Sequence, residues 1–134
     1  MVKLGMRYRA PAVHRELRRR RFERIVGRAV ASLTDEIQSR LENVEIVIEA
    51  EPRSGAESDD SDQLFGLYEG IPLTERTSAY GMTLPDKITI FQGPLERNFE
   101  TTAELHQQIR ITVLHEIAHH FGIDEQRLTE LGYD

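Results

Sequence analysis

Residues 115–125 read His-Glu-Ile-Ala-His-His-Phe-Gly-Ile-Asp-Glu, and the interpretation of the whole chain starts from this stretch. Histidines four positions apart on an α-helix point the same way, because the helix has ~3.6 residues per turn. Two imidazoles can then each lie ~2.0–2.1 Å from one zinc ion, with the glutamate between them placed to act as a base. The spacing predicts zinc as the cofactor, His115 and His119 as metal ligands, and Glu116 as the catalytic base.

A catalytic zinc also needs a third protein ligand, and it keeps one coordination position open. Gly122 is expected to end the helix and turn the chain back, because glycine is common just past a helix C-terminus. Glu125 follows at an offset where the chain can return to the metal, so it is the predicted third ligand. Asp124 and, less favoured, Glu130 are the alternatives. His120 is expected to point away from the metal.

The histidines belong to a helix that is predicted over residues 102–121. Thr101 to Glu104 fits a capping box, which marks where such a helix begins. Residues 21–41 show the same helical period and predict a second long helix. A short last helix is predicted over residues 125–132. In the helix predicted over residues 102–121, the apolar residues expected to face the core are Leu105, Ile109, Val113 and Ile117.

Three segments between these helices predict strands. Residues 44–49 alternate apolar with polar side chains and are rich in β-branched residues. Residues 64–70 and 87–91 are apolar runs that end at glycine and proline, whereas residues 50–62 and 73–84 are polar connections. Together these segments predict an α+β fold, with a small mixed β-sheet of about three or four strands packed on two long helices plus a short C-terminal helix.

The net charge of −6 hides an asymmetry along the chain. Residues 1–28 hold ten Lys and Arg against two Glu, whereas the other 106 residues hold seven basic and 21 acidic side chains. We therefore expect a basic N-terminal arm over residues 1–20, loosely held, and one domain over residues 21–134. We favour the interpretation that the arm is a solvated tail, and the more specific alternative is that it binds nucleic acid. The negative charge of the domain argues against a large surface that binds the phosphates of a nucleic acid.

Several classes of protein are excluded by what the sequence lacks. It has no cysteine, so it has no disulfide framework, thiolate ligand or cysteine nucleophile. No apolar run approaches the ~20 residues that cross a bilayer, which predicts no membrane contact. The N-terminus is positively charged, but no apolar stretch follows it as in a secretory signal. These features predict a cytoplasmic protein.

Beyond the histidine pattern, longer stretches of the chain resemble the minimal zincins, a family of small zinc metallopeptidases. The resemblance covers about residues 20–134, and it implies a short mixed sheet packed on helices with the zinc helix beneath. The family pattern resembles HExxHxxGxxD, related to that of the metzincins. The stretches that resemble the family are LFGLYEGIPLTERT (64–77), LPDKITIFQGPLER (84–97) and HEIAHHFGIDEQRLTELGY (115–133).

The resemblance also implies roles for single residues. His115 and His119 would be ligands, Glu116 the base, and Glu125 would occupy the third-ligand position. This chain departs from the family pattern there, because it has Glu where the family usually has Asp. Only nine residues follow Glu125, so the methionine turn of the metzincins cannot come from that segment.

The implied activity is that of a zinc-dependent peptidase. A zinc-activated water attacks the peptide bond, with Glu116 acting first as general base and then as general acid. The substrate is a peptide or protein, which in zincins binds by strand addition to a sheet edge. Tyr68, Tyr80 and Tyr133 are candidates to steady an oxyanion, although an ordinary half-buried tyrosine is favoured for each. The alternative function is a zinc-binding protein-interaction or regulatory module with little or no catalytic turnover.

Overall fold

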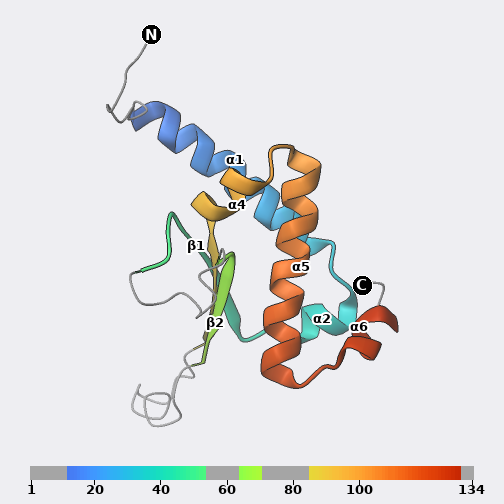
Figure 1. The fold of residues 1–134 in the computed structure, drawn as a ribbon. Coiled ribbons are helices and arrows are strands. Elements are labelled where there is room, and N and C mark those ends of the chain that lie inside the picture. Colours follow the sequence, from blue (N-terminus) through green and yellow to red (C-terminus); the bar gives the residue numbers. More distant parts are fainter. Residues whose placement is uncertain (1–11, 54–63, 71–84, 131–134) are drawn as a thin grey trace, which may run out of the picture.

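A three-stranded mixed sheet lies beside two helices of 20 residues each in the computed structural model of the chain (Figure 1). The structure describes residues 12–53, 64–70 and 85–130. This arrangement confirms the predicted α+β class. In chain order, the elements are α1 (Ala12–Ala31), α2 (Asp35–Arg40), β1 (Val44–Glu49), β2 (Gly66–Glu69), β3 (Asp86–Phe91), α4 (Gln92–Asn98), α5 (Thr102–Phe121) and α6 (Glu125–Glu130).

Strand β3 is the centre of the sheet, and the strand order is β1-β3-β2. β1 pairs with β3 in parallel, whereas β2 pairs with β3 antiparallel, with Gly66 opposite Ile90 and Glu69 opposite Lys87. No described strand pairs with the other side of β2, so β2 has a free edge in the described part of the chain. The three predicted strands are confirmed, with β2 shorter than expected.

Helix α5 begins and ends where the sequence predicts. The Thr101 side chain accepts a hydrogen bond from the Glu104 N–H at 3.0 Å, and the Glu104 side chain accepts one from the Thr101 N–H at 3.2 Å. Gly122 ends the helix in the left-handed conformation, with φ of 71°, which glycine adopts without a steric cost. These local bonds fix the length of the helix that carries the histidines.

The prediction of one helix over residues 21–41 is wrong at its start, and the predicted helix is in fact two helices. α1 starts at Ala12 and stops at Ala31, and α2 follows with Thr34 as its N-cap, accepting from the Ile37 N–H at 3.4 Å. Residues 12–20, expected to be loosely held, form the first part of α1, whose N-terminal end projects away from the sheet (Figure 1). The rest of the expected arm, residues 1–11, lies outside the described residues.

Helix α4 was not predicted, because Gly93 and Pro94 were interpreted as the end of a strand. Pro94 lies in the first turn of α4, where a missing N–H costs nothing. The chain therefore turns from β3 directly into a helix.

The core lies where α1, α5 and the sheet meet. α1 and β2 both pack against α5, and α6 adds Leu128 to the same cluster. Leu131, expected in the last helix, lies outside the described residues. None of the described helices has the length and apolarity to cross a bilayer. The fully buried side chains include Phe22, Ile25, Ile88, Ile90, Leu105, Ile109, Val113 and Ile117.

Candidate metal and catalytic site

His115, Glu116 and His119 lie near the C-terminal end of α5. Leu114, Ile117 and Ala118 on the same turns of the helix are buried. His115 and His119 are exposed, whereas Glu116 is half-buried. All three line one hollow of about 560 Å³, and its other walls include Ala118, Ile123, Asp124 and Leu128.

The carboxylate of Glu116 lies at the free edge of β2. Its Oε1 accepts a hydrogen bond from the backbone N–H of Tyr68 at 3.0 Å. The Phe91 N–H donates to the Phe65 carbonyl at 2.9 Å, so these two residues form a hydrogen-bonded pair of the antiparallel ladder. Such pairs alternate, and the backbone groups of Gly66 and Tyr68 therefore point away from β3. The predicted base thus touches the edge to which another strand could add.

The surroundings of Glu116 favour proton exchange. Burial raises the pKa of Glu116 above its usual 4.5, although the Tyr68 N–H and the imidazoles of His119 and His115 act in the opposite direction. A carboxylate with a raised pKa is a stronger base than an exposed one, and a larger fraction of it holds a proton near neutral pH. This environment suits a group that must both take and return a proton.

A close contact between β2 and α5 brings the strand edge to Glu116. A Cβ atom on Gly66 would lie 2.6 Å from Thr112 Cγ2 and 3.2 Å from the Thr89 carbonyl oxygen. Only glycine lets the backbone come this near without displacement. The Thr112 hydroxyl donates to the Gln108 carbonyl at 2.8 Å, which holds the side chain in place.

The third metal ligand is not settled by the described side chains, which form no cluster of three metal-binding groups. Glu125 is the first residue of α6, and its side chain is outside the description. Asp124 lines the hollow, and its Oδ1 accepts from the Arg127 N–H at 2.8 Å. Glu130 forms an ion pair with Arg127 at 3.1 Å. The donor type and spacing of the two histidines fit zinc, and Glu125 stays a prediction.

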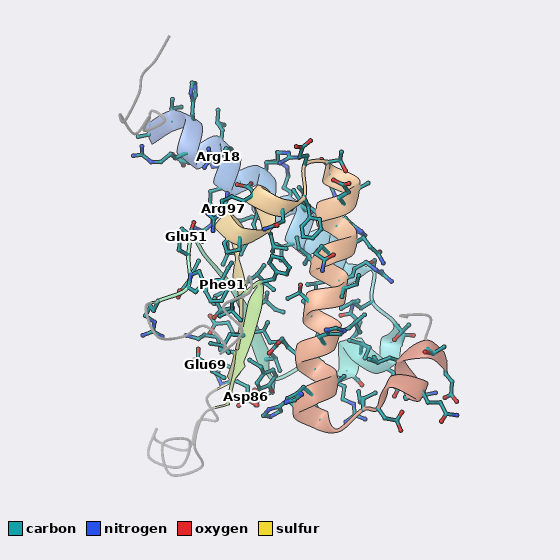
Figure 2. The ribbon with its side chains drawn as sticks, in the orientation of Figure 1. Arg18, Glu51, Glu69, Asp86, Phe91 and Arg97 are labelled. Carbon is teal, nitrogen blue, oxygen red and sulfur yellow. The ribbon has the colours of Figure 1, made fainter. Side chains whose placement is uncertain are left out.

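One cluster beside the site had no signal in the sequence. The Tyr68 hydroxyl donates to Asp86 at 2.6 Å, and the Tyr68 ring stacks on His120 with centroids 3.9 Å apart. Figure 2 shows Asp86 and Glu69 at the end of the sheet that is nearest the C-terminal end of α5. His120 therefore packs on β2, and it does not line the hollow of His115 and His119.

The tyrosines proposed for oxyanion binding have different positions. The Tyr68 hydroxyl is directed to Asp86, and the backbone N–H of the same residue contacts Glu116. Tyr80 and Tyr133 lie outside the described residues. Tyr68 thus contributes to the site through its backbone, which residue type alone did not reveal.

A family model described as zincin-like metallopeptidase matches residues 41–133, which is more than half of the chain. The matched range contains the three described strands, α4, α5 and α6, and it leaves out α1 and α2. No curated protein matches the chain.

Proposed function

Since the chain belongs to the zincin-like metallopeptidase family, we propose that it is a zinc-dependent peptidase. His115 and His119 hold the metal, and Glu125 supplies the third ligand. When bound, zinc supplies Lewis-acid chemistry, since it polarises a carbonyl group and lowers the pKa of water. The observation that carries the proposal is the contact of Glu116 with the free edge of β2, beside both histidines.

Glu116 is the proton carrier of the proposed reaction. Its Oε1 is held by the Tyr68 N–H, while its Oε2 accepts no hydrogen bond from the described residues. The carboxylate takes a proton from the attacking water as the new C–O bond forms. It then returns the proton to the amine nitrogen as the C–N bond breaks. The raised pKa of Glu116 favours the first transfer, because a carboxylate with a higher pKa is a stronger base.

The substrate is proposed to be an extended peptide. The backbone groups of Gly66 point to the free edge of β2, so a peptide can add there as a further strand. Strand addition would fix the peptide backbone alongside the carboxylate of Glu116. Main-chain bonds of this kind are sequence-independent, and selectivity must come from the side-chain pockets beside the edge.

Glu116→Gln tests the proposal with little change in shape. The amide oxygen of glutamine can still accept from the Tyr68 N–H, but glutamine cannot carry the proton. Cleavage of a peptide library should fall by ~10²–10⁴-fold, because general acid–base catalysis typically contributes that much. The bound zinc should be unchanged. Glu42→Gln makes the same change at an exposed carboxylate outside the hollow and should leave cleavage unaltered.

Equal cleavage by the wild type and Glu116→Gln would contradict the assigned role of this residue. Zinc binding without cleavage by either protein would favour the alternative function, a zinc-binding interaction or regulatory module with little turnover.

A further inference from the structure

Arginine is concentrated in one helix of this acidic chain. Helix α1 carries seven arginines, two glutamates and no lysine, whereas the chain as a whole has a net charge of −6. The family match begins at residue 41, so α1 lies outside it. The described residues that line the hollow of His115 and His119 include no arginine. The proposed active site therefore does not account for the positive charge of α1.

Three of these arginines lie in a row on the outer side of α1. Arg20, Arg24 and Arg28 are exposed and four positions apart, so they follow one another at ~6 Å along the helix axis. The opposite side of α1 faces the core. The residues buried on that side are Phe22, Ile25, Val26 and Ala29.

Two more arginines flank this row where α1 packs against α5. The Arg21 guanidinium donates to the Thr102 hydroxyl at 2.8 Å, and Arg110 of α5 donates to the Ser32 carbonyl at 3.1 Å. These bonds place both side chains at the seam between the two helices. We call the five residues of the row and the seam the arginine face, and they are Arg20, Arg21, Arg24, Arg28 and Arg110.

Little of the charge in the row is neutralised by neighbouring acids. Arg20 pairs with Glu16 at 2.7 Å, but both side chains are more than half exposed, and such surface pairs are weak. Arg24 and Arg28 form no ion pair with any residue that the structure describes. Their guanidinium groups are therefore available to an anion from outside the chain.

The surface beside Arg24 and Arg28 is also open. Gly27 lies next to both, and a Cβ atom added there would meet no atom within 4 Å. Glycine destabilises the interior of a helix, and no contact in the described part of the chain requires it here. The absence of a side chain lets an external group approach the helix backbone between the arginines.

We propose that the arginine face binds the phosphate backbone of double-stranded DNA without reading its sequence. A row of guanidinium groups suits a polymer with regularly repeated anions, because each group can bond a phosphate in bidentate fashion. Contacts to phosphates give affinity for DNA of any sequence. This binding goes beyond the proposed peptidase function and does not depend on it.

Other anionic partners fit the arginine face less well. Protein interfaces have an apolar core, and single-stranded nucleic acids are bound by stacking on aromatic rings, but the arginine face contains only arginines. A helix that lies in a membrane surface needs an apolar side, and that of α1 is buried in the core, which leaves only Val13 and Leu17 exposed.

The shape of α1 favours DNA over double-stranded RNA. The N-terminal end of the helix projects away from the sheet (Figure 1). A helix ~10–12 Å across fits the ~12 Å major groove of B-DNA, whereas the major groove of double-stranded RNA is too narrow. We therefore expect α1 to lie along the major groove with its arginines on the flanking phosphates.

Fluorescence anisotropy of a labelled DNA duplex tests the arginine face. The logarithm of the wild-type affinity should fall with the logarithm of the salt concentration with a slope of about −4.5, because each of five phosphate contacts contributes about −0.9. Arg24→Ala/Arg28→Ala should weaken binding by at least ~10-fold and reduce this slope by about 2. Arg40→Ala/Arg53→Ala removes the same charge at exposed positions outside the arginine face, and should leave the affinity and the slope nearly unchanged.

Gly27→Glu tests the same surface without removing an arginine. It places a carboxylate beside Arg24 and Arg28, whereas Gly27→Gln adds a neutral side chain of the same size. Both variants should fold, since a Cβ atom at this position meets nothing within 4 Å. Gly27→Glu should bind the duplex at least ~10-fold more weakly than Gly27→Gln, because like charges then face each other. Thermal unfolding of both variants checks that the fold is kept.

Three results would overturn the proposal. The first is no binding of the duplex by the wild type at low salt. The second is an equal loss in Arg24→Ala/Arg28→Ala and Arg40→Ala/Arg53→Ala, or equal binding by Gly27→Glu and Gly27→Gln, since the location of the charge would then not matter. The third is binding of single-stranded DNA, an RNA duplex, polyglutamate or vesicles of anionic lipid as tight as that of the DNA duplex, which would assign the arginine face to another partner or to anions in general.

Discussion

Replacing Gly66 with alanine should push β2 away from α5. The new Cβ would lie 2.6 Å from Thr112 Cγ2 and 3.2 Å from the Thr89 carbonyl oxygen. Carbon atoms pack best at ~3.5–4.0 Å, so the first contact is strongly repulsive. Thr112 has little freedom to rotate, because it is β-branched and its hydroxyl donates to the Gln108 carbonyl. The backbone of β2 must therefore move.

The expected loss in the free energy of unfolding follows from two opposing effects. Overpacking a tight contact typically costs about 1–3 kcal/mol. Replacing glycine by alanine restricts the unfolded chain and returns about 0.4–1 kcal/mol. We expect Gly66→Ala to lower the stability by about 1–2 kcal/mol. Cleavage should also fall, since the same displacement lengthens the 3.0 Å bond from the Tyr68 N–H to Glu116.

Thr112→Ser is the matched partner variant, because it removes only the methyl group and keeps the hydroxyl bond to Gln108. Urea unfolding followed by circular dichroism gives the stabilities of the wild type, both single variants and the double variant. Gly66→Ala should cost about 1 kcal/mol less in the Thr112→Ser background than in the wild type. Losses that simply add would refute the reasoning that the contact with Cγ2 sets the cost.

Three further predictions concern the capping box, the predicted base and the tyrosine beside it. Thr101→Ala should lower the stability to urea by about 1 kcal/mol, because it removes the hydrogen bond to the Glu104 N–H; an unchanged midpoint would contradict the cap. Because burial raises the pKa of Glu116, the folded, metal-free protein binds this proton more tightly than the unfolded chain. The resulting stabilisation is complete below the unfolded pKa and is lost as the pH rises through the folded pKa. The free energy of unfolding of chelator-treated protein, measured with urea at several pH values, should therefore decline less with rising pH in Glu116→Gln than in the wild type. Equal declines in the two proteins would disprove the effect. Tyr68→Phe removes the 2.6 Å hydrogen bond to Asp86, so thermal and urea unfolding should show a loss of about 1–2 kcal/mol; the loss should shrink when Asp86 is also replaced by Asn, and additive losses would argue against the bond.

Features that depend on neighbours in sequence were predicted well. The capping box at Thr101 and the glycine at 122 fixed both ends of α5. Alternation of polar and apolar residues located β1. The same local signals placed His115 and His119 one turn apart, which is why the site could be proposed from the sequence.

Local signals also misled where two of them competed. The apolar period continues from α1 into α2 through Leu33 and Ile37, so the sequence predicted one helix. The Thr34 cap interrupts it, yet both buried residues still reach the same core. Pro94 was interpreted as a breaker, although proline is accepted in the first turn of a helix, as in α4.

Contacts that join distant segments had no signal in the sequence. The bond from the Tyr68 N–H to Glu116 spans 48 residues and depends on how β2 pairs with β3. The contact of Tyr68 with Asp86 and its stacking on His120 depend on the same pairing. Neither periodicity nor residue spacing reports which strand becomes the edge beside a helix.

The most direct test of the proposed zinc site is the zinc content of protein purified without chelator and then supplied with zinc. We predict one zinc per chain for the wild type. His115→Ala and His119→Ala should each abolish tight binding, and Glu125→Ala should weaken it far more than Asp124→Asn, because a three-ligand site loses affinity with each donor removed. A content far below one per chain, or histidine variants that bind zinc like the wild type, would contradict the account.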